Sequence, residues 1–106
     1  MARWYHYQLN WVNNMTNEGI KLVQTCGACP EQYDAYLDNK MIGYLRLRHG
    51  NFTVRYPDHN GEIVFEAKPH GDGLFHYEER DLYLDLAKKF LLMKHNEVTK
   101  IQHNQK

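Results

Sequence analysis

The chain has few cysteines and no long apolar run. Its 106 residues include only two cysteines, too few for a disulfide scaffold. No stretch of about 18 apolar residues occurs, which argues against a transmembrane helix. The first 12 residues lack the apolar centre and cleavage site of a secretory signal. We therefore expect a cytoplasmic protein, without a membrane partner.

An excess of charge of either sign is also missing. Thirteen basic residues balance thirteen acidic ones. Proteins that bind nucleic acid without sequence preference usually have a basic surplus, because phosphate contacts drive their affinity. A DNA mimic would need an acidic surplus. The composition therefore argues against nucleic acid as the partner.

We expect one domain over residues 1–95 and a polar, flexible tail over residues 96–106.

Alternating apolar and polar side chains predict strands at residues 3–12 and 20–25. Three turn signals divide residues 33–67 into further strands: Asp38-Asn39-Lys40, His49-Gly50 and Asn60-Gly61. Glycine at the second turn position suits a two-residue type I′ turn, which requires positive φ there.

These turns set the register between neighbouring strands. The expected pairs are Leu37 with Met41, Ala35 with Gly43, Tyr33 with Leu45, Leu47 with Phe52, Leu45 with Val54, Tyr56 with Phe65, and Val54 with Ala67. All three registers agree on one apolar face, which a slip of one residue would break. Its members are Tyr33, Leu37, Leu45, Leu47, Phe52, Val54, Tyr56 and Phe65.

Helical periodicity follows near the C-terminus. Leu82, Leu86, Phe90 and Met93 recur at helical spacing and predict a helix from about Tyr77 to Lys94. Its apolar stripe must be buried, and the apolar face of the sheet is the partner that the chain offers. We predict an α+β fold, with an antiparallel sheet of five to six strands and one C-terminal helix packed on one face.

The opposite face of the sheet gathers Tyr44, Arg46, Arg48, Thr53 and Arg55. Guanidinium groups on a rigid sheet suit a phosphate, a carboxylate or an acidic protein surface. The alternative is a solvated polar face with cross-strand ion pairs. In the expected registers, Asp34 lies opposite Tyr44 and Glu66 lies opposite Arg55.

Trp4 belongs to the predicted N-terminal strand and would lie on this same face. Exposed tryptophan and tyrosine beside arginine is typical of protein-binding hot spots. Packing of Trp4 under a neighbouring loop is the alternative. The predicted partner-binding residues are Trp4, Tyr44, Arg46, Arg48 and Arg55.

The spacing of Cys26 and Cys29 fits half of a zinc site. His70 and His76 are the nearest paired candidates for the other ligands. Ordinary loop cysteines and a redox pair are the alternatives, although a redox pair would need a strand-to-helix context. We predict no metal, with these cysteines as weak candidates, and no cofactor.

Polar groups also gather before the helix. A general acid and base could come from His70, His76, Asp72, Glu78 and Glu79, but no nucleophile motif accompanies them. Ordinary surface histidines are the preferred interpretation. Glycines in Gly71-Asp72-Gly73 could cradle a phosphate ahead of the helix. The surrounding acidic side chains would repel that anion, so a flexible connector is the preferred interpretation.

Three runs together resemble a family of small, mostly uncharacterised bacteriophage and prophage proteins. They are residues 29–36 (CPEQYDAY), residues 43–50 (GYLRLRHG) and the strand that ends at Tyr56-Pro57; Gly71-Asp72-Gly73 and Glu79-Arg80 fit the same pattern. Residues 33–56 are also similar to the opening sheet of the GNAT acetyltransferases, whose acetyl-CoA-binding loop is missing here.

The resemblance implies a non-enzymatic phage protein that inhibits a host protein, such as a CRISPR effector or another anti-phage defence protein. A small-ligand (nucleotide) binding or sequestering protein and a small zinc-binding domain are the alternatives. Pairing of an open sheet edge with a second copy would give a homodimer.

Overall fold

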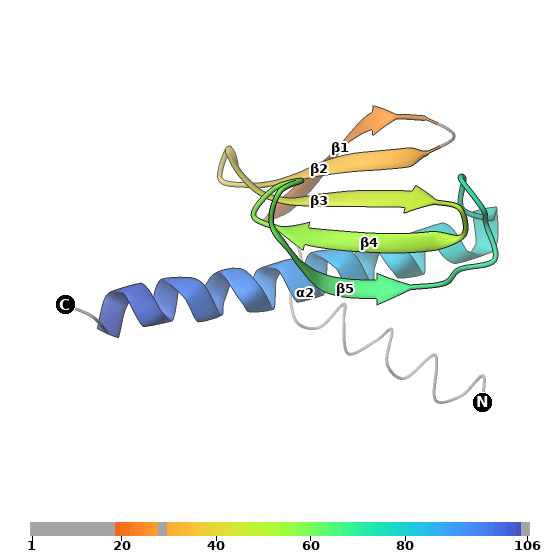
Figure 1. The fold of residues 1–106 in the computed structure, drawn as a ribbon. Helices are drawn as coiled ribbons and strands as arrows, with labels where there is room; N and C mark the ends of the chain where they lie inside the picture. The colour runs from red at the N-terminus through yellow and green to blue at the C-terminus, as the bar shows by residue number, and fades with distance from the viewer. Residues whose placement is uncertain (1–18, 28–29, 105–106) are drawn as a thin grey trace.

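In the computed structural model, five antiparallel strands form one sheet in sequence order, and a long helix covers one face of it (Figure 1). The structure describes residues 19–27 and 30–104, without the side chains of residues 101–104. The elements are β1 (Ile20–Cys26), β2 (Glu31–Leu37), β3 (Lys40–Arg48), β4 (Asn51–Tyr56), β5 (Glu62–Ala67) and α2 (Tyr77–Asn104). The predicted α+β fold is confirmed; the strand predicted at residues 3–12 lies outside the described residues.

The turn between β3 and β4 has the predicted form. His49 and Gly50 both have positive φ, at 54° and 72°, as a type I′ turn requires. Leu47 lies opposite Phe52, and Leu45 lies opposite Val54. This register is confirmed.

The turn between β2 and β3 is one residue shorter than predicted. Asp38 and Asn39 form it, with φ values of 51° and 66°, so Leu37 pairs with Lys40 and not with Met41. Aspartate and asparagine tolerate this left-handed conformation better than most residues. A bulge beside Ala35 absorbs the extra residue of β3 and restores the predicted pairing of Ala35 with Gly43.

The connection between β4 and β5 differs most from the prediction. Phe65 lies opposite Val54 and Ala67 opposite Phe52, two residues from the predicted register. Pro57 has no N–H to donate and follows the last residue of β4, so the loop is longer than the Asn60-Gly61 pair. Within this loop, Asp58 accepts from the backbone N–H groups of Asn60 and Gly61, both at 2.9 Å.

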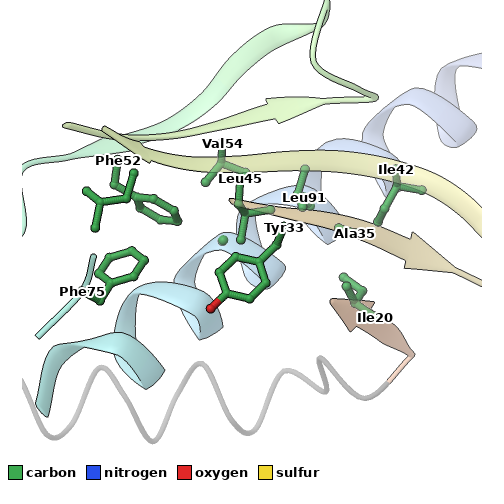
Figure 2. Packing of buried hydrophobic residues seen from close by; sticks show 11 residues of the cluster. Ile20, Tyr33, Ala35, Ile42, Leu45, Phe52, Val54, Phe75 and Leu91 are labelled. Atoms are coloured by element: carbon green, nitrogen blue, oxygen red, sulfur yellow. The ribbon is translucent and has the colours of Figure 1, made fainter. Parts of the chain in front are cut away.

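The core lies between the sheet and α2, as Figure 2 shows. Its fully buried members come from the central strands and from α2, and include Leu45, Leu47, Phe52, Val54, Ala87 and Leu91. The remaining residues of the predicted apolar face are buried or packed against this cluster. Gly43 lets the helix approach, because a Cβ there would lie 2.5 Å from Leu91 Cδ1.

Helix α2 begins at Tyr77, as predicted, but ends at Asn104 and not at Lys94. Polar composition suggested a tail after residue 95, yet a helix stops at glycine, proline or a competing contact, and none of these follows Lys94. In Figure 1 the last turns of α2 project beyond the sheet. Among the described residues, no helix combines the length and the apolar character needed to cross a membrane.

The contact between Gly43 and Leu91 gives a prediction about packing. Gly43→Val should destabilise the fold by about 1–3 kcal/mol, because the added methyl groups overlap the Leu91 side chain. Leu91→Ala alone should cost about 2–5 kcal/mol through the cavity it leaves. The double variant should lose less stability than the sum of the two single losses, because the smaller residue at position 91 leaves room for the larger one at position 43. Urea unfolding measures all three, and additive losses would contradict the contact.

Candidate functional site

The sheet face opposite α2 assembles the predicted polar residues in adjoining rows. Arg46 lies opposite Thr53, and Tyr44 lies opposite Arg55. Asp34 lies opposite Tyr44, as predicted. Arg46 and Arg55 are half-buried, whereas Arg48 is exposed at the end of β3. We call Tyr44, Arg46, Arg48 and Arg55 the arginine face.

None of the three guanidinium groups has a carboxylate partner among the described residues. Arg55 donates from Nη1 to the carbonyl oxygen of Gly61 at 2.8 Å. Arg48 donates from Nε to His49 Nε2 at 3.2 Å. The buried Nε of Arg46 has no acceptor in the described part of the chain. Among the described residues, no ion pair neutralises these three arginines, although Asp34 and Glu66 lie on the same face.

The expected pair of Arg55 with Glu66 does not form. Because β5 is displaced from its predicted register, Ile63 lies opposite Arg55 and Glu66 lies opposite Thr53. Glu66 instead accepts a hydrogen bond from Asn51 Nδ2 at 2.9 Å. The predicted pairing of Arg55 with Glu66 is therefore wrong, and the alternative of a solvated polar face is not tested by it.

Tyr44 is fixed in the middle of this face. Its hydroxyl donates to Gln32 Oε1 at 2.9 Å. Its ring also meets His59 edge to face, with 6.1 Å between the ring centroids. A tyrosine held in this way presents its ring with little further loss of side-chain freedom on binding.

Two other predicted sites are only partly described. Trp4 and Cys29 lie outside the described residues, so neither the Trp4 contact nor the cysteine pair is tested. Cys26 is half-buried at the end of β1. In the described ranges, no group of three or more His, Cys, Asp or Glu side chains could hold a metal ion.

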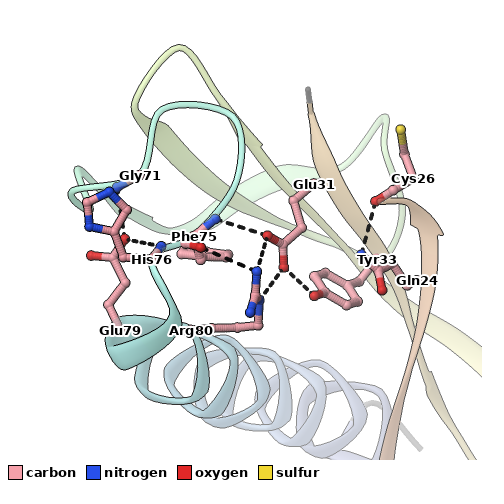
Figure 3. Close-up of polar contacts among 9 residues, drawn as sticks. All are labelled: Gln24, Cys26, Glu31, Tyr33, Gly71, Phe75, His76, Glu79 and Arg80. Carbon is pink, nitrogen blue, oxygen red and sulfur yellow. Dashed lines mark hydrogen bonds and ion pairs between the residues drawn. The ribbon is translucent and has the colours of Figure 1, made fainter. Parts of the chain in front are cut away.

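A buried carboxylate behind the arginine face was missed by the sequence analysis. The Glu31 side chain is 0% exposed. Arg80 donates to it from Nε at 2.9 Å and from Nη2 at 3.2 Å. The Tyr33 hydroxyl and the Phe75 backbone N–H also donate to it (Figure 3). The signal was present, because Glu31, Tyr33 and Ala35 alternate onto the same buried face.

These donors decide the charge of Glu31. Burial opposes ionisation, but the hydrogen bonds from Arg80, Tyr33 and Phe75 outweigh it and hold the pKa below its ordinary value. Burial and the neighbouring carboxylate both raise the pKa of Tyr33, so its hydroxyl stays protonated and donates. Glu31 is thus an ionised group with its acceptors occupied.

The segment before α2 is pinned, contrary to the prediction of a flexible connector. The Gly50 N–H donates to the Asp72 carbonyl oxygen at 2.7 Å, and the Glu31 N–H donates to that of Gly73 at 2.9 Å. Gly71 is required here, since a Cβ would lie 2.0 Å from the Leu74 carbonyl oxygen. Backbone pairing of this kind depends on the tertiary fold and leaves no signal in the local sequence.

Glu79 holds the other side of this segment. It is the third residue of α2, and its carboxylate accepts from the backbone N–H groups of His70, Gly71 and His76 at 2.8–3.0 Å. The bond from His76 is one half of a capping box. Burial raises the pKa of Glu79, but the three N–H donors outweigh that effect and lower the pKa overall.

The contacts of this polar cluster are those of a structural cap at the start of α2. His70 and His76 stack with 6.1 Å between their ring centroids, and His76 Nδ1 lies 3.8 Å from Glu78 Oε1. Three backbone donors occupy most of the acceptor positions of Glu79, one at Oε1 and two at Oε2. The cluster can fix the start of α2, and this is the role its contacts support.

Comparison with protein-family models, curated proteins and solved structures found no match for this chain. Function is therefore inferred from the side chains and their contacts.

Removal of the Glu31 charge should strongly destabilise the protein. Glu31→Gln leaves the Arg80 guanidinium next to a neutral group in a buried setting. Breaking a buried ion pair in this way should cost about 3 kcal/mol of stability. This value is at the lower end of the range for such pairs, because Arg80 is partly exposed. Chemical denaturation measures the loss. Glu78→Gln, at an exposed position of the same helix turn, is the control and should change little. Equal effects of the two variants would contradict the role of Glu31.

The lowered pKa values of Glu31 and Glu79 predict acid lability. The unfolded chain binds protons more readily at both carboxyls, so stability is present above their ordinary pKa of 4.5 and is lost as the pH falls below it. Urea unfolding between about pH 7 and pH 3 should give a falling free energy. Glu79→Gln should flatten that fall; an unchanged slope would contradict the assignment.

Proposed function

We propose that this protein is a non-enzymatic binding protein that engages an acidic surface of a partner protein through its arginine face. The observation that carries the proposal is the set of three arginines on a rigid sheet without a carboxylate partner among the described residues. Elsewhere in the described fold, Arg80 and Lys94 each form an ion pair with a carboxylate.

Arginine suits this role physically. Its planar guanidinium binds carboxylates through two parallel hydrogen bonds and is more weakly hydrated than an ammonium group. Arg46 and Arg55 are half-buried, so their side chains lose less freedom on binding than exposed ones would. Tyr44 adds an aromatic anchor of the kind enriched at protein-binding hot spots.

The buried ionisable groups support binding over catalysis. Glu31 and Glu79 are ionised, and structural donors occupy their oxygens. A general base needs a free acceptor within reach of a substrate proton. Four donors fill the acceptor positions of Glu31, and three backbone donors leave Glu79 at most one.

The resemblance to small bacteriophage proteins suggests the class of partner. We propose a host protein in the bacterial cytoplasm, such as a CRISPR effector or another defence protein, which this phage-type protein inhibits by covering an acidic surface. The proposal of a protein partner agrees with the balanced net charge, which a general nucleic-acid binder would not have.

Charge reversal on the arginine face tests the proposal. Tagged protein is used for pull-down from a bacterial lysate that expresses several defence systems, with mass spectrometry of what co-purifies. Arg46→Glu combined with Arg55→Glu should abolish capture of the stoichiometric partner, because both contacts become repulsive. The melting temperature should stay nearly unchanged.

Lys88→Glu combined with Lys100→Glu is the matched control, since it makes the same change of net charge on α2, which covers the opposite face of the sheet. This variant should retain the partner. Capture that survives reversal of Arg46 and Arg55 would remove the arginine face from consideration. Stabilisation by a nucleotide without any protein partner would favour a small ligand.

A further inference from the structure

We propose a second binding site, independent of the arginine face, in the groove between β5 and α2. Its occupant is an extended peptide of a partner protein that adds to β5 as a further strand. The groove is lined by Glu62, Ile63, Val64, Phe90, Met93, Lys94 and Glu97.

Strand β5 supplies the backbone half of the site. It is the last strand of the described sheet, paired with β4 on one side. Its other side presents N–H and C=O groups with no partner strand in the described part of the chain. Such an edge is a template for an added strand, and main-chain hydrogen bonds give that mode of binding its affinity.

Helix α2 supplies the apolar half. Phe90 stacks on Phe65 with 4.9 Å between the centroids and 12° between the planes, which fixes the ring beside β5. Met93 is 46% exposed and Ile63 is 41% exposed, although both are large apolar residues. An apolar side chain of the added strand would bury this surface, and the alternation of the strand would direct every second side chain towards it.

The rim of the groove selects the charge of the occupant. Lys94 Nζ lies 3.0 Å from Glu62 Oε1 and 3.9 Å from Glu97 Oε1. One ammonium group thus serves two carboxylates, and the rim keeps a negative excess. A basic residue next to the apolar one would complement it. Charged residues at a sheet edge also oppose unwanted strand pairing. Because the charged excess here is acidic, a strand with basic side chains is still attracted.

A synthetic peptide of about six residues, a typical strand length, with alternating valine and lysine is the direct probe. It is capped at both ends, labelled with a fluorophore and titrated with the full chain while anisotropy is measured. The expected result is saturable binding. A version N-methylated at alternate residues should bind about tenfold more weakly or worse, because it cannot complete the ladder.

Two variants locate the binding on the protein. Ile63→Lys and Met93→Lys should each weaken binding by about tenfold or more, since each replaces exposed apolar surface with a repelling charge. Val23→Lys is the matched control, because Val23 lies on the other edge strand, β1, and is 42% exposed. It should bind the peptide as the unsubstituted chain does.

Several outcomes would overturn the proposal: no binding of the peptide, equal binding of the N-methylated version, or an equal loss in Val23→Lys. A concentration-dependent dimer that Ile63→Lys dissociates would also overturn it, because the edge would then belong to a second copy. The Arg46→Glu variant, whose change lies on β3 and not beside β5, should keep its peptide binding, so the two proposed sites can fail separately.

Discussion

The buried carboxylate of Glu31 is the contact on which the arrangement of sheet, loop and helix depends. It comes from the first residue of β2, yet its donors belong to three places in the chain: Tyr33 in the same strand, Phe75 in the loop and Arg80 in α2. A buried charge without these donors would be very costly. The fold therefore reaches its lowest free energy only when the loop and the first turns of the helix are seated against β2.

Seating α2 in this way decides which face of the sheet stays open. Glu79 fixes the first turn from the loop side, and Leu91 reaches the backbone of β3 at Gly43. The helix then covers the apolar face, and the alternation of β3 and β4 sends their arginines to the other side. The arginine face is a consequence of the same alternation that builds the core.

The sequence was sufficient wherever local chemistry governs the outcome. The His49-Gly50 turn, the apolar face and the start of α2 at Tyr77 all follow from turn preference, alternation and helical spacing. The register of β5 could not be read in this way. Asn60-Gly61 is a strong turn signal, but Pro57 ends β4 before that turn can form a tight hairpin. The resulting shift of two residues puts Glu66 opposite Thr53, and a further irregularity between Val54 and Arg55 puts Ile63 opposite Arg55.

The buried ion pair and the loop contacts could not be predicted, because they join residues that are far apart in the chain. Glu31 sits at an apolar position of an alternating strand, and its partner Arg80 lies 49 positions along the chain. The backbone bonds that pin Asp72 and Gly73 have no local signature at all.

The charged residues discussed above fall into two groups, those that are paired within the fold and those that are not. Glu31 and Glu79 are buried, and the hydrogen bonds that their carboxylates accept join parts of the fold to one another. Arg46, Arg48 and Arg55 have no counter-charge among the described residues, although half-buried positions such as those of Arg46 and Arg55 make an unpaired charge unfavourable. A charge that the fold does not neutralise can gain more from an external carboxylate than one that is already paired. That asymmetry, more than the number of arginines, is the physical reason to place the proposed partner on this face.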